Sequence, residues 1–489
     1  MKPVLFCPVA LALWLCGQAV AADSRPRNLL AEAKPQFCLA AESVPAWTDV
    51  FPAAGGPVRA RWEFSLADAT PWSSVTLQSS QGVESCLLNG TRVSPPLKGM
   101  RYATWPGISS HLLRAGSNTL EIEFGISRRS KDKPAPAVAL IPLVPADLDF
   151  QTEPVLGDAG QDYFTVGCRT NMPAEVTLEV AGRRWESPAG LMHCFRAGEL
   201  QGGTVQSYTL TAHVADSGAK RRIGPFHVST LPLPSQPLHF VAMGDSRTFP
   251  NDWARVANAV VQKNPALVVF SGDMVADGRE DCLWDTEFFG AAKTYFASIP
   301  TFYVIGNHED ASPLLGPLVP VAGRAHWKAA VGAALFIGID GAQDWSASSE
   351  NVKWMEASLK ASREPFIFVC SHYPPWSSGF HGAMHERTSI EARNNILPLM
   401  KKYHATAFIA GHDHDYERSE PPDGVTVIVS GGAGAPLYPK SPVPWQNPHS
   451  KVFECKHHFC LFAIDGNKCT MQSLTPEGTV LDNRTWPAR

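Results

Sequence analysis

The 489-residue sequence lacks the features that mark nucleic-acid-binding, membrane-spanning and repetitive proteins. It has 42 Lys and Arg against 46 Asp and Glu, a formal net charge of -4, and no basic run of the kind that binds a phosphate backbone. Beyond its N-terminus, no segment approaches the ~20 consecutive apolar residues of a membrane-spanning helix. No fixed-period repeat or low-complexity tract is present. We therefore expect a globular protein of two or three domains, without a nucleic-acid partner.

The first residues have the pattern of an export signal. Lys2 supplies a basic start, residues 4–16 form a short apolar run, and Ala19-Val20-Ala21 fits a small-residue cleavage site. The run is too short to cross a bilayer. We predict a signal peptide at residues 1–21, a secreted or periplasmic protein, and no membrane contact after cleavage. An uncleaved membrane anchor is the alternative interpretation.

Nine cysteines follow the predicted signal, an odd number that leaves at least one thiol unpaired. Export permits disulfides, and neighbours within one predicted domain are natural partners: Cys38 with Cys86, and Cys168 with Cys194. Cys370 lies inside an apolar strand pattern and is expected to be a buried thiol. A further pair is open among the last three cysteines, Cys455, Cys460 and Cys469.

The first half of the chain has the texture of all-β modules. In residues 22–145, runs such as Leu120–Phe124 alternate polar with apolar side chains, and Asn89-Gly90 is a tight-hairpin signal. This stretch resembles jelly-roll galactose-binding-like modules, so carbohydrate contact and a plain structural sandwich are both open interpretations. Residues 146–235 are predicted to form a second β-sandwich, which ends in a proline-rich linker.

The texture changes in residues 236–489. Continuous apolar runs replace the alternation, and helical patterns lie between several of them, at residues 253–263, 288–296, 352–362 and 390–402. Strands without polar alternation, joined by helices, indicate a sheet buried on both faces. The predicted fold class is therefore multidomain, with N-terminal all-β sandwich modules followed by an α/β domain.

Polar residues of metal-ligand type follow five of these buried strands. The carboxyl ends of parallel strands meet at one crevice, and the neighbouring glycines let the backbone turn toward it. Carboxylates and imidazoles favour Fe, Zn or Mn over calcium, and a carboxylate can bridge two ions. Each motif alone is weak, but five in order are specific. They are Gly244-Asp245, Gly272-Asp273, Gly306-Asn307-His308-Glu309, Ser371-His372 and Gly411-His412-Asp413-His414.

This order of motifs resembles that of the calcineurin-like metallophosphoesterase superfamily. The block from Gly411 to Arg418 is most similar to that of the purple acid phosphatases, as is the glycine-rich stretch that follows it. Residues 165–173 similarly resemble the sandwich that precedes the catalytic domain in those enzymes. The resemblance implies a four-layer β-sandwich flanked by helices in residues 236–489.

By motif, the resemblance also assigns the metal ligands for two divalent or transition-metal ions. Asp273 is expected to bridge the ions. Asn307, His372 and His412 would complete the second site, while Asp245 and His414 would hold the first.

The resemblance further implies residues that face the phosphate. His308 is expected to stabilise the transition state or protonate the leaving group. His381 lies nine residues after His372, where the subgroup keeps a second phosphate-facing histidine, and a solvated loop histidine is the alternative. His385 is a weaker candidate.

The sequence departs from the family pattern at the first metal site. Purple enzymes have a tyrosine three residues past the bridging aspartate, and here that residue is Ala276. The wider superfamily often has a histidine two residues past the first aspartate, and here that residue is Arg247. A first-site ligand is thus absent from both usual places. We expect Arg247 to hold a phosphate oxygen, with a surface salt bridge as the alternative.

These residues predict an exported phosphatase that hydrolyses phosphate monoesters by metal-hydroxide attack at a dinuclear site, with a small phosphorylated substrate as its partner. Two alternatives remain open. One is a phosphodiesterase or nucleotide hydrolase on the same scaffold, and the other is a binding protein with a degenerate metal site.

Overall fold

The computed structural model describes residues 28–489 except for 42–44, 53–56, 69–71, 125–134, 310–311, 383–385, 423 and 444. The predicted export signal and His385 therefore lie outside the described residues. Within the described part, no helix combines the length and the apolar character that crossing a membrane requires.

The N-terminal region is a seven-stranded antiparallel sheet in the order β1-β2-β6-β3-β4, with β5 and β7 also paired to β3. Along β2, the side chains of Val58, Ala60 and Trp62 are buried on one face, as expected of a half-buried strand. The strands are β1 (Gln36–Leu39), β2 (Val58–Leu66), β3 (Ser74–Leu88), β4 (Thr91–Val93), β5 (Tyr102–Ile108), β6 (Gly116–Phe124) and β7 (Val138–Leu143).

The predicted hairpin at Asn89-Gly90 is confirmed. β3 ends at Leu88 and β4 begins at Thr91, and the two residues join antiparallel strands. Asn89 and Gly90 have φ values of 53° and 76°, the left-handed pair that a two-residue turn between twisted strands requires.

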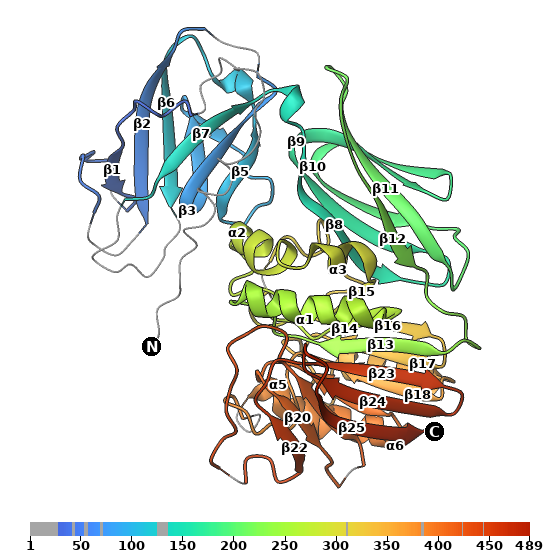
Figure 1. Ribbon diagram of the computed structural model, residues 1–489. Coiled ribbons are helices and arrows are strands. Elements are labelled where there is room, and N and C mark those ends of the chain that lie inside the picture. Colours follow the sequence, from blue (N-terminus) through green and yellow to red (C-terminus); the bar gives the residue numbers. More distant parts are fainter. Residues whose placement is uncertain are drawn as a thin grey trace.

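A second, five-stranded antiparallel sheet follows, in the order β10-β9-β11-β12 with β8 paired to β9. Figure 1 shows it lying against the short helices α2 (Asp281–Leu283) and α3 (Lys293–Ser298). Its strands are β8 (Phe150–Ala159), β9 (Phe164–Val180), β10 (Arg183–Ala197), β11 (Val205–Val214) and β12 (Ala219–Ser229).

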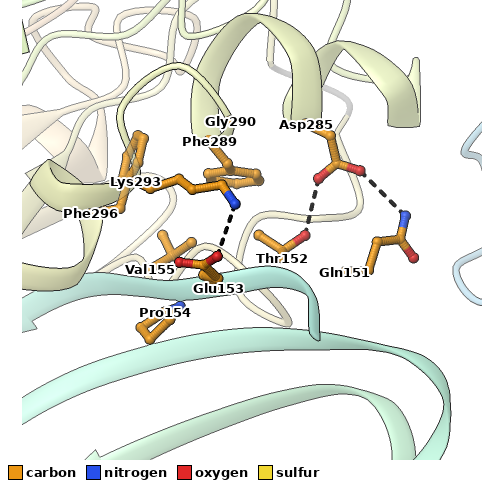
Figure 2. A pocket seen from close by; sticks show the side chains of 10 residues that line it. All are labelled: Gln151, Thr152, Glu153, Pro154, Val155, Asp285, Phe289, Gly290, Lys293 and Phe296. Atoms are coloured by element: carbon orange, nitrogen blue, oxygen red, sulfur yellow. Dashed lines mark hydrogen bonds and ion pairs between the residues drawn. The ribbon is translucent and has the colours of Figure 1, made fainter. Parts of the chain in front are cut away.

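Buried charge joins this sandwich to the following domain. The guanidinium of Arg169 on β9 is buried and donates to Asp281 at 2.5 Å and to Asp285 at 2.7 Å. Figure 2 shows the adjoining crevice, in which Thr152 donates to Asp285 at 3.0 Å and Lys293 pairs with a glutamate of β8. Because removing one partner of a buried pair leaves an uncompensated charge, these contacts hold the sandwich against the domain.

The remaining strands form two mixed sheets. One runs β15-β14-β13-β23-β24-β25, and the other β16-β17-β18-β19-β21-β20-β22. The strands are β13 (Leu238–Met243), β14 (Leu267–Phe270), β15 (Thr301–Tyr303), β16 (His326–Val331), β17 (Ala334–Ile339), β18 (Phe366–Cys370), β19 (Ala407–Ala410), β20 (Tyr416–Ser419), β21 (Thr426–Ser430), β22 (Ser450–Glu454), β23 (Phe459–Asp465), β24 (Lys468–Leu474) and β25 (Val480–Pro487).

The two sheets pack face to face with helices outside them. Phe240 of one sheet stacks on Phe462 at 4.5 Å and meets Phe336 of the other sheet edge-on at 4.8 Å. Helix α1 (Pro250–Lys263) and α3 bury their apolar sides on the first sheet, while α4 (Glu350–Ala361) and α6 (Leu397–Lys402) cover the second. The predicted fold class, β-sandwich modules followed by a four-layer α/β domain, is confirmed.

One predicted helix is two segments. The pattern at residues 288–296 spans the end of a π-helical turn, η3 (Trp284–Phe289), and the start of α3. Gly290 follows the turn, and glycine is a poor helix former. The break lets Phe288 and Phe296 approach the same buried ring of Trp253 from two directions. Helix α5 (Arg387–Glu391) and the π turn η4 (Ala392–Ile396) precede α6 in the same way.

The predicted disulfides are wrong. Cys168 pairs with His193 across β9 and β10, so Cys194 points to the opposite face, and neither sulfur forms a disulfide. Cys38 on β1 is separated from Cys86 on β3 by two strands, too far for a bridge. None of the last three cysteines forms a disulfide either. Cys370 is a buried thiol, as predicted.

Candidate metal centre

The six predicted metal ligands all lie in the loops that directly follow five strands. Asp245 follows β13, Asp273 follows β14, and Asn307 follows β15, all in the first sheet. His372 follows β18, while His412 and His414 follow β19, both in the second sheet. The carboxyl ends of these parallel strands meet at one edge of the stacked sheets, and this edge brings the side chains together.

The backbone is strained where these ligands sit. Asp245, Asp273 and His412 have φ values of 62°, 55° and 71°, a left-handed region that costs a non-glycine residue free energy. A preceding glycine makes room in at least one case: a Cβ on Gly411 would lie 2.2 Å from Asp245 Oδ2. The Gly-Asp and Gly-His motifs thus reflect the close approach of loops from different sheets.

Four of the side chains converge on one point. His372 Nε2 lies 3.0 Å from Asn307 Oδ1, 3.2 Å from His412 Nδ1 and 3.3 Å from Asp273 Oδ1. His372 Nδ1 donates to the carbonyl of Ser271 at 2.7 Å, so its Nε2 carries a lone pair. We call Asp273, Asn307, His372 and His412 the second-site group.

The other ring of this group has the matching tautomer. His412 Nε2 faces the carboxylate of Glu386 at 3.0 Å and donates to it, so in the neutral ring Nδ1 carries the lone pair. Burial lowers the pKa of His372 to about 4, which keeps its ring neutral. Acceptor atoms therefore face one another at hydrogen-bond distance. Their mutual repulsion is relieved by a cation held among them.

The remaining two ligands lie on the other side of Asp273. His414 Nε2 is 3.6 Å from Asp245 Oδ1, and its Nδ1 donates to the carbonyl of Pro436 at 2.7 Å. Burial, helped by the charge of Arg247, lowers the pKa of His414 to about 3. Burial, with the charge of Asp273 nearby, raises the pKa of Asp245. We call Asp245, Asp273 and His414 the first-site group.

The donors present fit two metal ions. Within the described residues, Asp245, Asp273 and His372 can point ligand atoms at one ion, and so can His381, Glu386 and His412. Carboxylate and imidazole donors with fixed tautomers suit divalent transition metals. The expected cofactor, a pair of such ions, is supported.

Arg247 lies inside the first-site group. Its Nε is 3.3 Å from Asp273 Oδ2, and its Nη2 is 3.4 Å from His414 Nε2. The side chain of Arg247 is only 15% exposed, so the alternative interpretation as a surface salt bridge does not describe it. Ala276, at the position where purple enzymes have a tyrosine, has no side-chain ligand atom, and its backbone N–H donates to Glu287.

The two candidate phosphate-facing histidines border the centre. His308 Nε2 lies 3.6 Å from Asp273 Oδ2, its Nδ1 is fixed 2.6 Å from the carbonyl of Ala276, and its side chain is 26% exposed. The ring of His381 lies 4.1 Å from that of His412, and its Nδ1 is 3.4 Å from Glu386. The structure thus brings both residues to the ligand cluster.

Sequence reasoning missed three supporting residues. Glu309 is buried and accepts the backbone N–H groups of Asp273 and Gly306, joining two ligand loops. Its place directly after Asn-His was a signal for this role. Glu386 orients His412 from a separate loop, and Tyr438 stacks on His414 at 4.1 Å. No sequence pattern marks Glu386, whereas Tyr438 ends the glycine-rich stretch that resembles the purple acid phosphatases.

Comparisons with known proteins agree with this geometry. Residues 238–416 match the family model of the calcineurin-like phosphoesterases. The chain is 32% identical over 89 residues, 18% of its length, to human tartrate-resistant acid phosphatase type 5, and the match covers 26% of that enzyme. It is 24% identical over 312 residues to an Fe(3+)-Zn(2+) purple acid phosphatase of Arabidopsis thaliana, covering 58% of this chain and 64% of that one.

The fold agrees over a longer stretch. A purple acid phosphatase from yellow lupin (Lupinus luteus) seeds superposes with a TM-score of 0.64 at 16% identity, covering 93% of this chain and 96% of that one. Residues 238–416 are therefore similar to the calcineurin-like phosphoesterases, and the chain resembles the purple acid phosphatases in sequence and fold.

Proposed function

We propose that this protein is an exported metal-dependent phosphatase that hydrolyses phosphate monoesters. The observation that carries the proposal is the geometry of the second-site group. Its acceptor atoms on Asp273, Asn307 and His412 all lie within 3.3 Å of His372 Nε2. Such a cluster binds a cation, and in the neighbouring first-site group Asp245 Oδ1 and His414 Nε2, which lie 3.6 Å apart, offer donors for another. When bound, the two ions supply Lewis acidity and lower the pKa of water toward neutrality.

Asp273 suits the bridging position. Its Oδ1 faces His372 in the second-site group, while its Oδ2 faces Arg247 in the first-site group. Burial favours the neutral acid, but the facing imidazoles, His372 before His308, and the guanidinium of Arg247 outweigh burial and lower the pKa of Asp273 below its usual range. The carboxylate is therefore ionised and presents one oxygen to each side.

His308 and His381 are proposed to handle the proton of the leaving group. His308 is held by Ala276 through Nδ1, so its Nε2, 3.6 Å from Asp273 Oδ2, is the ring nitrogen left to meet a substrate. Hydrogen bonding to Glu386 raises the pKa of His381, which favours a protonated ring able to donate. A general acid of this kind contributes roughly 10²–10⁴-fold to such reactions.

Arg247 is proposed to contact a phosphate oxygen. Its planar, permanently charged guanidinium matches the geometry of a phosphate, and it lies beside both His414 and Asp273. Fe, Zn and Mn all remain candidates for the bound ions, since the donor types fit each of them.

The test is hydrolysis by the purified chain after removal of metal and reconstitution with Mn²⁺, Zn²⁺ or Fe. We expect an aryl phosphate monoester to be cleaved only by the reconstituted protein, and faster than the matching bis-aryl phosphate. A faster diester would identify the phosphodiesterase alternative. Full metal loading without hydrolysis of either would identify a binding protein.

Export is a separate part of the proposal and rests on the sequence of residues 1–21. Expression of the full chain in a secreting host should release a protein whose N-terminus begins at or near Ala22. N-terminal mass spectrometry checks this. A retained Met1 in the exported fraction would instead indicate an uncleaved anchor.

A further inference from the structure

The two groups of the metal centre differ in which atoms face the lone pairs of their ligands. In the first-site group, Nη2 of Arg247 lies 3.4 Å from Nε2 of His414. Because His414 Nδ1 donates to Pro436, Nε2 is the acceptor atom that a metal ion would need. Arg247 already donates a hydrogen bond to this nitrogen.

The guanidinium of Arg247 also lies beside a second ligand of the first-site group, Asp273. Arg247 Nε lies 3.3 Å from Oδ2 of Asp273, the oxygen that faces away from His372. The hydroxyl of Tyr438, whose ring stacks on His414, interacts with the guanidinium as well. A guanidinium stays protonated throughout the accessible pH range, so it brings a full positive charge among these donors.

Among the residues that the structure describes, no arginine or lysine contacts His372, His412 or Asn307. His372 Nε2 meets His412 Nδ1, Asn307 Oδ1 and Asp273 Oδ1. An ion entering there meets acceptors that repel one another. An ion entering the first-site group meets a cation at nearly the same place, and like charges in a buried setting repel strongly.

We infer that Arg247 gates the first metal site. The second-site group takes up its ion first and tightly, and the first-site group takes up an ion only when free metal is abundant enough to displace Arg247 from Asp273 and His414. The chain therefore responds to metal concentration in two steps. This inference rests on the metal centre of the proposed function but concerns the order of loading rather than the reaction.

The test is metal binding, measured without reference to hydrolysis. Mn²⁺ is the probe, because it prefers oxygen and nitrogen donors and leaves the thiols of the chain aside. Isothermal titration and electron paramagnetic resonance of free Mn²⁺ give the two affinities. We expect the wild type to bind one ion at least about tenfold more tightly than the other, the smallest gap that a buried unit charge beside a divalent ion should produce.

The variant Arg247→Gln should tighten the weaker step by about tenfold or more and leave the tighter step unchanged. Arg247→Lys keeps the positive charge and should keep most of the gap. Arg255→Gln is the matched control, since exposed Arg255 pairs only with surface Asp252 and Glu477 and its loss changes net charge equally. It should leave both steps unchanged. Thermal melts establish that each variant is folded.

The outcomes separate the two claims. Two ions of equal affinity in the wild type, or an unchanged gap in Arg247→Gln, would overturn the gating role while leaving a metal-dependent phosphatase intact. If Arg247→Lys behaved like Arg247→Gln, positive charge would not be the cause and the inference would fail. Absence of any Mn²⁺ binding would overturn the metal centre and the gate together.

Discussion

The two sides of the metal centre are built from the same parts and differ in charge. Each takes its ligands from loops after strands of both sheets, and each contains a histidine whose Nδ1 donates to a backbone carbonyl, His372 to Ser271 and His414 to Pro436. On one side the remaining lone pairs face one another. On the other, Arg247 donates to His414 and places its positive charge 3.3 Å from Asp273. Shared strand-end geometry therefore does not imply equal metal affinity, because a single side chain decides whether the donors are vacant.

The largest expected effect comes from the residue that both sides share. Asp273→Asn removes the charge between the two groups, and we expect hydrolysis of an aryl phosphate to fall by at least about 10³-fold, as when a principal electrostatic stabiliser is lost. Steady-state kinetics measure it. Asp277→Asn, four residues on and paired with Arg101, should retain activity. Most of the activity surviving in Asp273→Asn would refute the assignment of the centre.

A pair of histidine variants tests whether the sides are unequal. His372→Ala should abolish the tight Mn²⁺ step, because it removes the ring on which the second-site group converges. His414→Ala should leave that step within about threefold of the wild type, since its ring contacts Asp245, Arg247 and Tyr438 rather than the second-site histidines. Metal titration measures both. Equal losses in the two variants would contradict the asymmetry.

A third variant tests Glu309, whose side chain accepts the backbone N–H of Asp273. Glu309→Ala leaves the buried N–H groups of Asp273, Met274 and Gly306 without their acceptor. We expect the free energy of unfolding to fall by about 3–5 kcal/mol, the range for breaking a buried charged network. Urea unfolding of the metal-free protein measures it. Glu477→Ala, at an exposed site, should change little, and a similarly small change in Glu309→Ala would show that the loops hold without this carboxylate.

A smaller effect is expected from the carboxylate that orients His412. Glu386→Gln keeps the shape of the side chain but weakens the acceptor for His412 Nε2. Loss of such an outer partner lowers metal affinity by roughly tenfold. The reduction should fall on the tight Mn²⁺ step alone, since Glu386 contacts His381 and His412 and, within the described part of the chain, no member of the first-site group. A change in the weak step only would be the contrary result.

The last expected effect concerns acid, to which both sides should respond alike. Burial lowers the pKa of His372 to about 4 and that of His414 to about 3, whereas both rings titrate near ~6.5 in the unfolded chain. Between these values the unfolded chain binds more protons than the folded one, so stability falls as pH is lowered. The melting temperature of metal-free protein should therefore decline from about pH 6.5 toward 4. A flat profile across that window would argue against neutral, buried rings.

Much of the fold was predictable because its signals are local. Continuous apolar runs marked the strands that two sheets and their helices bury, and Asn89-Gly90 marked a turn whose φ values the twist of the strands demands. The disulfides were not predictable in the same way. Cys168 and Cys194 are close in the chain and lie on adjacent strands, yet the register places their side chains on opposite faces.

The sequence by itself determined the ligand types and their order, because each of the five motifs follows an apolar strand and four of them begin with a glycine. Only the tertiary structure decided what those ligands meet. Glu386 reaches His412, and Arg247 reaches His414, across loops separated by 26 and 167 positions in the chain. Such contacts depend on how the two sheets stack and on which ring nitrogen donates to a distant carbonyl. The spacing of residues along the chain determines neither.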